Sequence, residues 1–156
     1  MNRKAVIDLG TNTFNLLIAD VTNKGFQVVH SEKEGVALGM GGINQNIIVP
    51  EATERAIQSL QRFSETCKKF KVDRLVAIGT SAIRGANNAT KFINEVRQKT
   101  GLEIQVISGE REAELIYHGV KWSFPFREAS TVMDIGGGST EFVFADNEGI
   151  RDLISL

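Results

Sequence analysis

Apolar residues in the first part of the chain occur in short runs that turn residues separate. The runs occupy residues 4–8, 14–20 and 26–38, with a Gly-Thr-Asn-Thr turn at 10–13 and Asn23-Lys24-Gly25 between the second and third runs. Short apolar runs bounded by Gly and Asn are typical of strands joined by tight turns. We predict three consecutive antiparallel strands.

In the middle of the chain, the spacing of apolar residues changes to that of a helix. Pro50 and Glu51 suit a first helical turn, and apolar side chains then recur every three or four residues at Ala52, Ala56, Leu60, Phe63, Cys67 and Phe70. A strand at 74–79, a helix at 89–99, a strand at 103–107 and a helix from Ser108 to about Gly119 are expected next. Alternating helices and strands favour parallel pairing, so we predict an α/β fold whose mixed sheet has three antiparallel strands, then parallel strands flanked by helices.

The chain repeats its own beginning after residue 130. With an offset of 126 residues, Asp8 aligns with Asp134, Gly10 with Gly136, and Ala19 with Ala145. One copied strand-turn-strand unit predicts two related domains, the first at 1–125 and the second at 126–156. Only the opening hairpin of the second domain is expected within this sequence. We therefore expect the isolated polypeptide to have little or no activity and to associate through uncovered strands.

Composition narrows the class of protein. The sequence of 156 residues is 42% hydrophobic and 24% charged, as in a soluble globular protein. Its 18 basic and 19 acidic residues give a net charge of −1, and no basic cluster suits nucleic acid. No apolar run reaches the roughly 18 residues of a membrane span. The single cysteine, Cys67, cannot form an internal disulfide, which favours a reducing, cytoplasmic location.

Both copies of the repeated turn consist of small residues. Such turns expose backbone N–H groups to an anion. The candidate phosphate-binding residues are Gly10, Thr11, Asn12 and Thr13 in the first turn and Gly136, Gly137, Gly138, Ser139 and Thr140 in the second. Each turn taken singly could equally be an ordinary hairpin. The sequence has neither a dinucleotide fingerprint nor a P-loop motif.

Several charged residues are expected near these turns. Asp8 and Asp134 end their strands directly before them, where carboxylates could bind Mg²⁺ beside phosphate or simply cap the turn. Glu141 adds a third acid at the position that aligns with Asn15. Arg84 follows a strand and precedes a helix, where it could bind phosphate or remain a solvated surface residue.

A candidate general base lies in the helix after Ser108. Glu110 and Glu114 fall on its polar side, whereas Glu112 lies at the border of its apolar stripe. Partial desolvation would raise the pKa of the Glu112 carboxyl toward the range of a general base. The alternative is that all three acids merely favour the helix N-terminus.

Four spaced motifs, at residues 8–17, 79–87, 107–115 and 134–141, resemble the exopolyphosphatase and guanosine pentaphosphate phosphohydrolase family. That family belongs to the actin, sugar kinase and Hsp70 superfamily. The resemblance covers the whole chain in order. It implies ribonuclease H-like (actin-like ATPase) domains with a phosphate-binding cleft, and a cytoplasmic enzyme whose full-length form could be a homodimer.

The resemblance also assigns roles to residues. Glu112 matches the catalytic base, Asp134 and Glu141 match acids that position a metal and the attacking water, and Arg84 matches a cleft arginine. The metal would be Mg²⁺, with Mn²⁺ as an option, bound by Asp134, Asp8 and Glu141. The family often has two adjacent glutamates where this chain has Arg111 and Glu112.

The expected reaction is hydrolysis of terminal phosphoanhydride bonds of inorganic polyphosphate by a Glu-activated water. One alternative is removal of the 5′-terminal phosphate of guanosine pentaphosphate (pppGpp). The other is a regulatory or assembly protein that binds nucleotide without hydrolysing it.

Overall fold

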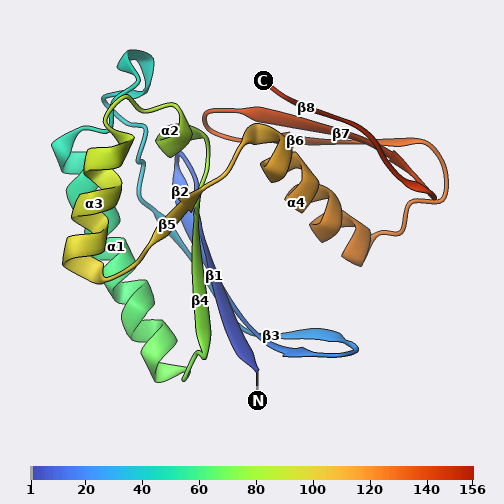
Figure 1. The fold of residues 1–156 in the computed structure, drawn as a ribbon, viewed down its shortest axis with the longest axis horizontal. Coiled ribbons are helices and arrows are strands. Elements are labelled where there is room, and N and C mark those ends of the chain that lie inside the picture. The colour runs from blue at the N-terminus through green and yellow to red at the C-terminus, as the bar shows by residue number, and fades with distance from the viewer. Residues whose placement is uncertain (1) are drawn as a thin grey trace. The chain divides into compact units, whose positions relative to one another are not determined.

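The structure is a computed structural model that describes residues 2–156. It contains two compact units, of which the first ends at Val106 and the second comprises Ile107–Leu156 (Figure 1). Among residues 2–156, every helix is too short or too polar to span a membrane.

The first unit contains a five-stranded mixed sheet in the order β3-β2-β1-β4-β5. Its first three strands pair antiparallel, and the last two are parallel to β1. The strands are β1 (Arg3–Leu9), β2 (Thr13–Thr22), β3 (Gly25–Gly35), β4 (Arg74–Gly79) and β5 (Ile104–Val106). This topology confirms the predicted mixed sheet.

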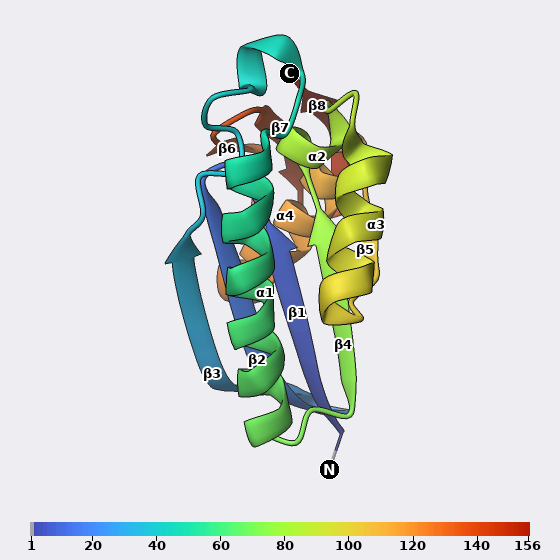
Figure 2. The same cartoon turned by 90° about the vertical axis from the view of Figure 1, so that its left-hand side faces the viewer.

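Helices cover one face of this sheet, where Figure 2 shows α1 and α3 side by side. The helices of the unit are α1 (Pro50–Lys69), α2 (Ser81–Arg84) and α3 (Ala89–Thr100), with a short 3-10 turn, η1 (Ile43–Gln45). Proline suits the start of α1 because the missing N–H has no partner to lose there. Glu51 in the first turn and two lysines in the last turn suit the helix dipole.

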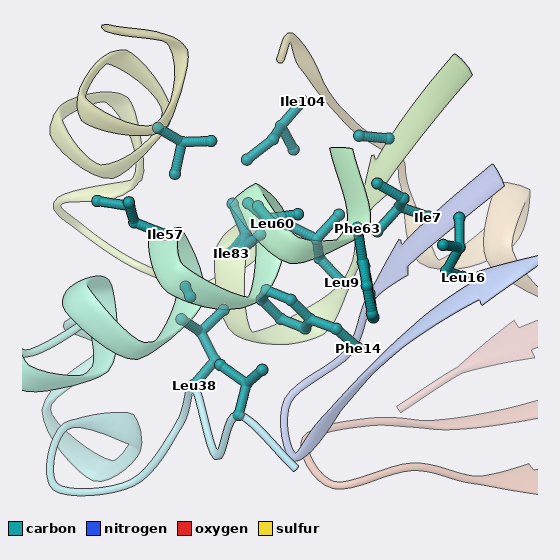
Figure 3. Packing of buried hydrophobic residues seen from close by; sticks show 14 of the residues in the cluster. Ile7, Leu9, Phe14, Leu16, Leu38, Ile57, Leu60, Phe63, Ile83 and Ile104 are labelled. Carbon is teal, nitrogen blue, oxygen red and sulfur yellow. The ribbon is translucent and has the colours of Figure 1, made fainter. Parts of the chain in front are cut away.

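The core of the first unit lies between α1, α3 and the inner face of the sheet (Figure 3). Alternate strand residues such as Ile7, Leu9 and Phe14 are fully buried there against Leu60 and Phe63 of α1. Burying side chains of this size contributes roughly 1.5–3 kcal/mol each.

The second unit is a three-stranded antiparallel sheet with one helix packed along β7 and β8 (Figure 1). Its elements are α4 (Gly109–Ser123), β6 (Ser130–Ile135), β7 (Thr140–Asp146) and β8 (Gly149–Ser155). Ser108 caps α4 as predicted, accepting a hydrogen bond on Oγ from the Arg111 N–H (3.2 Å). The helix continues past Gly119 because its apolar stripe, including Tyr117 and Val120, packs against this sheet.

The division between the units differs from the domain boundary predicted at 125/126. The structure divides the chain after Val106, and α4 packs on β7 and β8. Sequence periodicity identifies the apolar face of a helix but not the sheet that this face will cover. The assignment of 1–125 and 126–156 to separate domains stays a prediction.

The two copies of the repeated hairpin bury opposite faces. In the first unit, Ile7 and Leu9 are 0% exposed, whereas Val6 on the other face is 40% exposed. In the second unit, the residues that align with Ile7 and Leu9 are Met133 and Ile135, which are 56% and 69% exposed. There, α4 covers the face that remains open in the first unit.

The open face of β6, β7 and β8 gives a physical basis for the predicted association. We expect the isolated 156-residue polypeptide to self-associate at micromolar concentration, because exposed apolar side chains such as Met133, Ile135 and Leu156 favour burial between copies. Light scattering measures this, and a Met133→Ser/Ile135→Ser variant should associate less. A monodisperse monomer that cleaves polyphosphate at about 1 s⁻¹ or faster would contradict both this expectation and that of low activity.

Candidate active site

The first predicted phosphate loop is the tight turn between β1 and β2. The Gly10 N–H donates to the Thr13 carbonyl oxygen across the turn (3.1 Å). A Cβ atom on Gly10 would lie only 2.9 Å from that oxygen. Glycine at this position is therefore a requirement of the turn geometry.

The carbonyl groups of this loop are occupied by donors from other segments. The Thr11 oxygen accepts from the Gly39 N–H (3.1 Å) and the Asn12 oxygen from the Ala37 N–H (2.8 Å). The Leu9 oxygen accepts from both the N–H and the hydroxyl of Thr80 (3.4 Å each). These contacts orient the peptide groups of the loop.

The N–H groups of the same loop differ from its carbonyl groups in their hydrogen bonding. The N–H groups of Thr11 and Asn12 donate no hydrogen bond to any acceptor within residues 2–156. Asn12 is exposed, whereas the Thr11 side chain is buried. A loop whose acceptors are occupied and whose donors are available suits an anion.

Two further candidates lie at the same end of the first sheet. The Asp8 carboxylate accepts a hydrogen bond from Asn15 Nδ2 (3.1 Å) on the paired strand. Parallel pairing places Leu9 of β1 opposite Gly79 of β4, so α2, which ends at Arg84, begins at the edge where the phosphate loop lies. Asp8 and Arg84 are both half-buried.

The second predicted phosphate loop, between β6 and β7, repeats this geometry. The Gly136 N–H donates to the Ser139 carbonyl oxygen (3.0 Å), as Gly10 does to Thr13. Gly137 and Gly138 are exposed, and their N–H groups donate no hydrogen bond within residues 2–156. Thr140 begins β7. The structure thus confirms that the turn predicted from the sequence is duplicated.

The two acids beside the second loop have different surroundings. Asp134 and Glu141 face each other across β6 and β7, where the first unit has Asp8 and Asn15. Glu141 is only 1% exposed, and its Oε1 accepts a hydrogen bond from Ser155 Oγ (2.9 Å). Asp134 is exposed. Asp134 is therefore the acid of this pair that solvent and ligands can reach.

Glu112 lies in the first turn of α4 and is half-buried. Its neighbour Ala113 is 0% exposed, whereas Glu110 is exposed. Arg111 forms an ion pair with Glu114 on the same helix. Glu112 thus has the position at the border of the apolar stripe that the sequence predicts for it.

The acids of the candidate site suit Mg²⁺ only where water and substrate phosphates supply the other ligands. Within residues 2–156, no group of three or more His, Cys, Asp or Glu side chains could hold a metal ion together. Mg²⁺ commonly uses one or two carboxylates together with water and substrate phosphates. Asp8 in the first unit and Asp134 in the second each offer one carboxylate of this kind, and the buried Glu141 suits such a role less.

The sequence analysis missed the residues that support the first loop, namely Ala37, Gly39 and Thr80. The glycine-rich stretch 39–42 was the available signal. Gly39 is needed because a Cβ there would lie 2.7 Å from Thr11 Cγ2.

We expect Gly10→Ala to lower the free energy of unfolding by about 1–3 kcal/mol, because the added methyl group would push against the Thr13 carbonyl. Gly35→Ala is the matched control, since a Cβ on Gly35 meets no atom within 4 Å. Chemical denaturation measures both variants. Equal losses of stability in the two would contradict the geometry of the first loop.

Comparison with known proteins shows which family the chain resembles. The sequence profile of the Ppx/GppA phosphatase family matches residues 17–156. The solved exopolyphosphatase from Cytophaga hutchinsonii is 40% identical, with a TM-score of 0.95 over 99% of this chain and 50% of its own. The Ppx/GppA phosphatase of Aquifex aeolicus is 33% identical, with a TM-score of 0.85 over 100% of this chain and 52% of its own. The chain spans about half the length of these relatives.

A more distant structure shows how widely the fold is shared. MreB5 of Spiroplasma citri bound to ADP is 17% identical, with a TM-score of 0.51 over 100% of this chain and 52% of its own. This likeness concerns the fold alone and confirms the predicted actin-like class. The family match confirms the resemblance identified from the four motifs, and the chain belongs to the Ppx/GppA phosphatase family.

Proposed function

We propose that the protein hydrolyses terminal phosphoanhydride bonds of inorganic polyphosphate, with Mg²⁺ as cofactor. The observation that carries this proposal is the pair of loops with matching geometry, Gly10 to Thr13 at 3.1 Å and Gly136 to Ser139 at 3.0 Å. Both loops offer backbone donors that are not used elsewhere within residues 2–156. Phosphoryl transfer depends mainly on positioning and charge neutralisation, which such donors provide.

Each residue has a defined role in this proposal. The N–H groups of Thr11, Asn12, Gly137 and Gly138 bind phosphoryl oxygens, and Arg84 adds a guanidinium that can bind phosphate in bidentate fashion. Asp8 and Asp134 would hold Mg²⁺, which when bound would neutralise charge on adjacent phosphoryl groups.

Glu112 is the general base in this proposal. Its carboxylate accepts a proton from a water molecule as the water oxygen bonds to the terminal phosphorus. The bond from that phosphorus to the bridging oxygen breaks, and the shortened polyphosphate leaves with the bridging oxygen. The backbone donors stabilise the negative charge that develops there. The half-buried position of Glu112 at the start of α4 supports this role, because the carboxylate is partly shielded from bulk water.

We propose polyphosphate rather than pppGpp as the substrate because the relative at 40% identity is an exopolyphosphatase. Hydrolysis of pppGpp is the alternative within the same family. A phosphate-release assay on the full-length protein with polyphosphate, pppGpp and ATP separates these options. We expect the highest kcat/KM with polyphosphate. Release from pppGpp alone would replace the proposed substrate, and release from none of the three would support a binding protein instead.

A further inference from the structure

The segment Val36–Gly39, here called the backing segment, follows β3 and lies against the first phosphate loop. Its Ala37 and Gly39 N–H groups donate to the Asn12 and Thr11 carbonyl oxygens, at 2.8 and 3.1 Å. It therefore occupies the acceptors of the two residues whose own N–H groups are available to a ligand. Because the Thr11 carbonyl and the Asn12 N–H belong to one planar peptide group, the direction of the Asn12 N–H depends on this segment.

The backing segment has an unusual conformation that requires support. Ala37 has φ = 50°, in the left-handed region that residues with a Cβ seldom adopt. Such a residue persists where the surrounding contacts fix it. Its neighbours Val36 and Leu38 are buried, at 2% and 0% exposure, so the segment is held by packing on both sides of Ala37.

Arg55 of α1 supplies the polar part of that support. Its Nε donates to the Val36 carbonyl oxygen (2.8 Å), and its Nη2 donates to the Ala37 carbonyl oxygen (2.9 Å). A guanidinium that binds two successive carbonyls fixes the orientation of both peptide groups. Arg55 precedes Ala56, which is 0% exposed in the core, so its backbone is rigid.

We propose that Arg55 is a positioning residue for the first phosphate loop. It fixes the backing segment, which binds the Thr11 and Asn12 carbonyls. The Thr11 carbonyl shares its peptide group with the Asn12 N–H, so this contact directs the Asn12 N–H toward phosphate. The part of this inference that concerns phosphate rests on the proposed function, whereas the part that concerns loop order does not.

Arg62 provides a matched control on the same helix. Its guanidinium also makes two hydrogen bonds to the β3 region, but both go to the Glu34 carboxylate (2.9 and 2.6 Å), and none goes to the backing segment. Arg55→Ala and Arg62→Ala thus remove the same side chain from one helix, half-buried at Arg55 and exposed at Arg62. Only the first change affects the carbonyls of Val36 and Ala37.

The test measures amide hydrogen exchange and ligand affinity in the full-length protein. In Arg55→Ala, the Ala37 and Gly39 amides should exchange about tenfold faster, while core amides such as that of Ile7 keep the wild-type rate. The Kd for methylenediphosphonate, whose P–C–P link is not hydrolysed, should rise about tenfold in calorimetry with Mg²⁺. Arg62→Ala should leave both quantities unchanged.

The outcomes separate the inference from the proposed function. Unchanged exchange of Ala37 and Gly39 in Arg55→Ala would overturn the positioning role, as would faster exchange that extends equally to the core. If the wild-type protein binds no methylenediphosphonate, the proposed function fails, and the exchange data still decide whether Arg55 orders the loop. Faster local exchange with unchanged affinity would overturn the link between Arg55 and phosphate binding.

Discussion

Replacing Glu112 by Gln is expected to lower the turnover of polyphosphate by about 10²–10⁴-fold and to leave its binding nearly unchanged. Glutamine has almost the same shape as glutamate but cannot accept the proton of the attacking water. The phosphate-binding N–H groups lie in the loops at residues 10–13 and 136–139, outside α4. Steady-state kinetics gives the turnover number, and calorimetric titration gives the affinity.

Glu110→Gln is the matched control for this experiment. Glu110 lies in the same first turn of α4 but is exposed, so its replacement should change kcat less than threefold. A Glu112→Gln enzyme as active as the wild type would remove the proposed base. Equal losses in the two variants would indicate a general effect of charge at the start of the helix.

Removal of Mg²⁺ with excess EDTA is expected to reduce hydrolysis at least about 100-fold. Adjacent phosphoryl groups concentrate negative charge. Because Arg84 is the single cationic residue that we propose for this site, Mg²⁺ is expected to neutralise the remaining charge. Asp134→Asn should in turn raise the Mg²⁺ concentration needed for half-maximal rate about tenfold, since it removes the exposed carboxylate beside the second loop. A titration of the initial rate against Mg²⁺ measures both effects.

Asp152→Asn controls for the loss of one negative charge. Asp152 is exposed on β8 and pairs across the sheet with Phe144, on the opposite face from Glu141. Its replacement should leave the Mg²⁺ dependence unchanged. Full activity in EDTA would refute a metal role, and identical Mg²⁺ curves for Asp134→Asn and the wild type would exclude Asp134 as a ligand.

Local sequence signals predicted most of the secondary structure because the corresponding residues follow clear periodicities. The strand at 74–79 and the helix that begins at Pro50 have the predicted bounds, within one residue. Turn residues also located both tight turns proposed as phosphate loops, since only a small residue allows the contact between Gly10 and the Thr13 oxygen. These features depend on neighbours within a few residues.

Features that depend on distant parts of the chain were not predictable in the same way. The apolar stripe of α4 was evident, but periodicity does not specify that Val143 and Ala145 would be its partners. The support of the first loop likewise depends on hydrogen bonds that the Ala37 and Gly39 N–H groups donate to loop carbonyls about 25 residues earlier in the chain. Glycines in a sequence do not by themselves reveal close packing, but a Cβ on Gly42 would lie 2.2 Å from the Ile47 oxygen, so packing requires this glycine.

The most direct test of the two proposed phosphate loops is an NMR titration of the full-length protein with methylenediphosphonate in the presence of Mg²⁺. The account predicts saturable shifts of the amide resonances of Thr11, Asn12, Gly137 and Gly138. The amide of Lys91, which lines a separate pocket beside α1 and α3, should not move. Saturable shifts at Lys91 with unmoved amides in both loops would contradict the account.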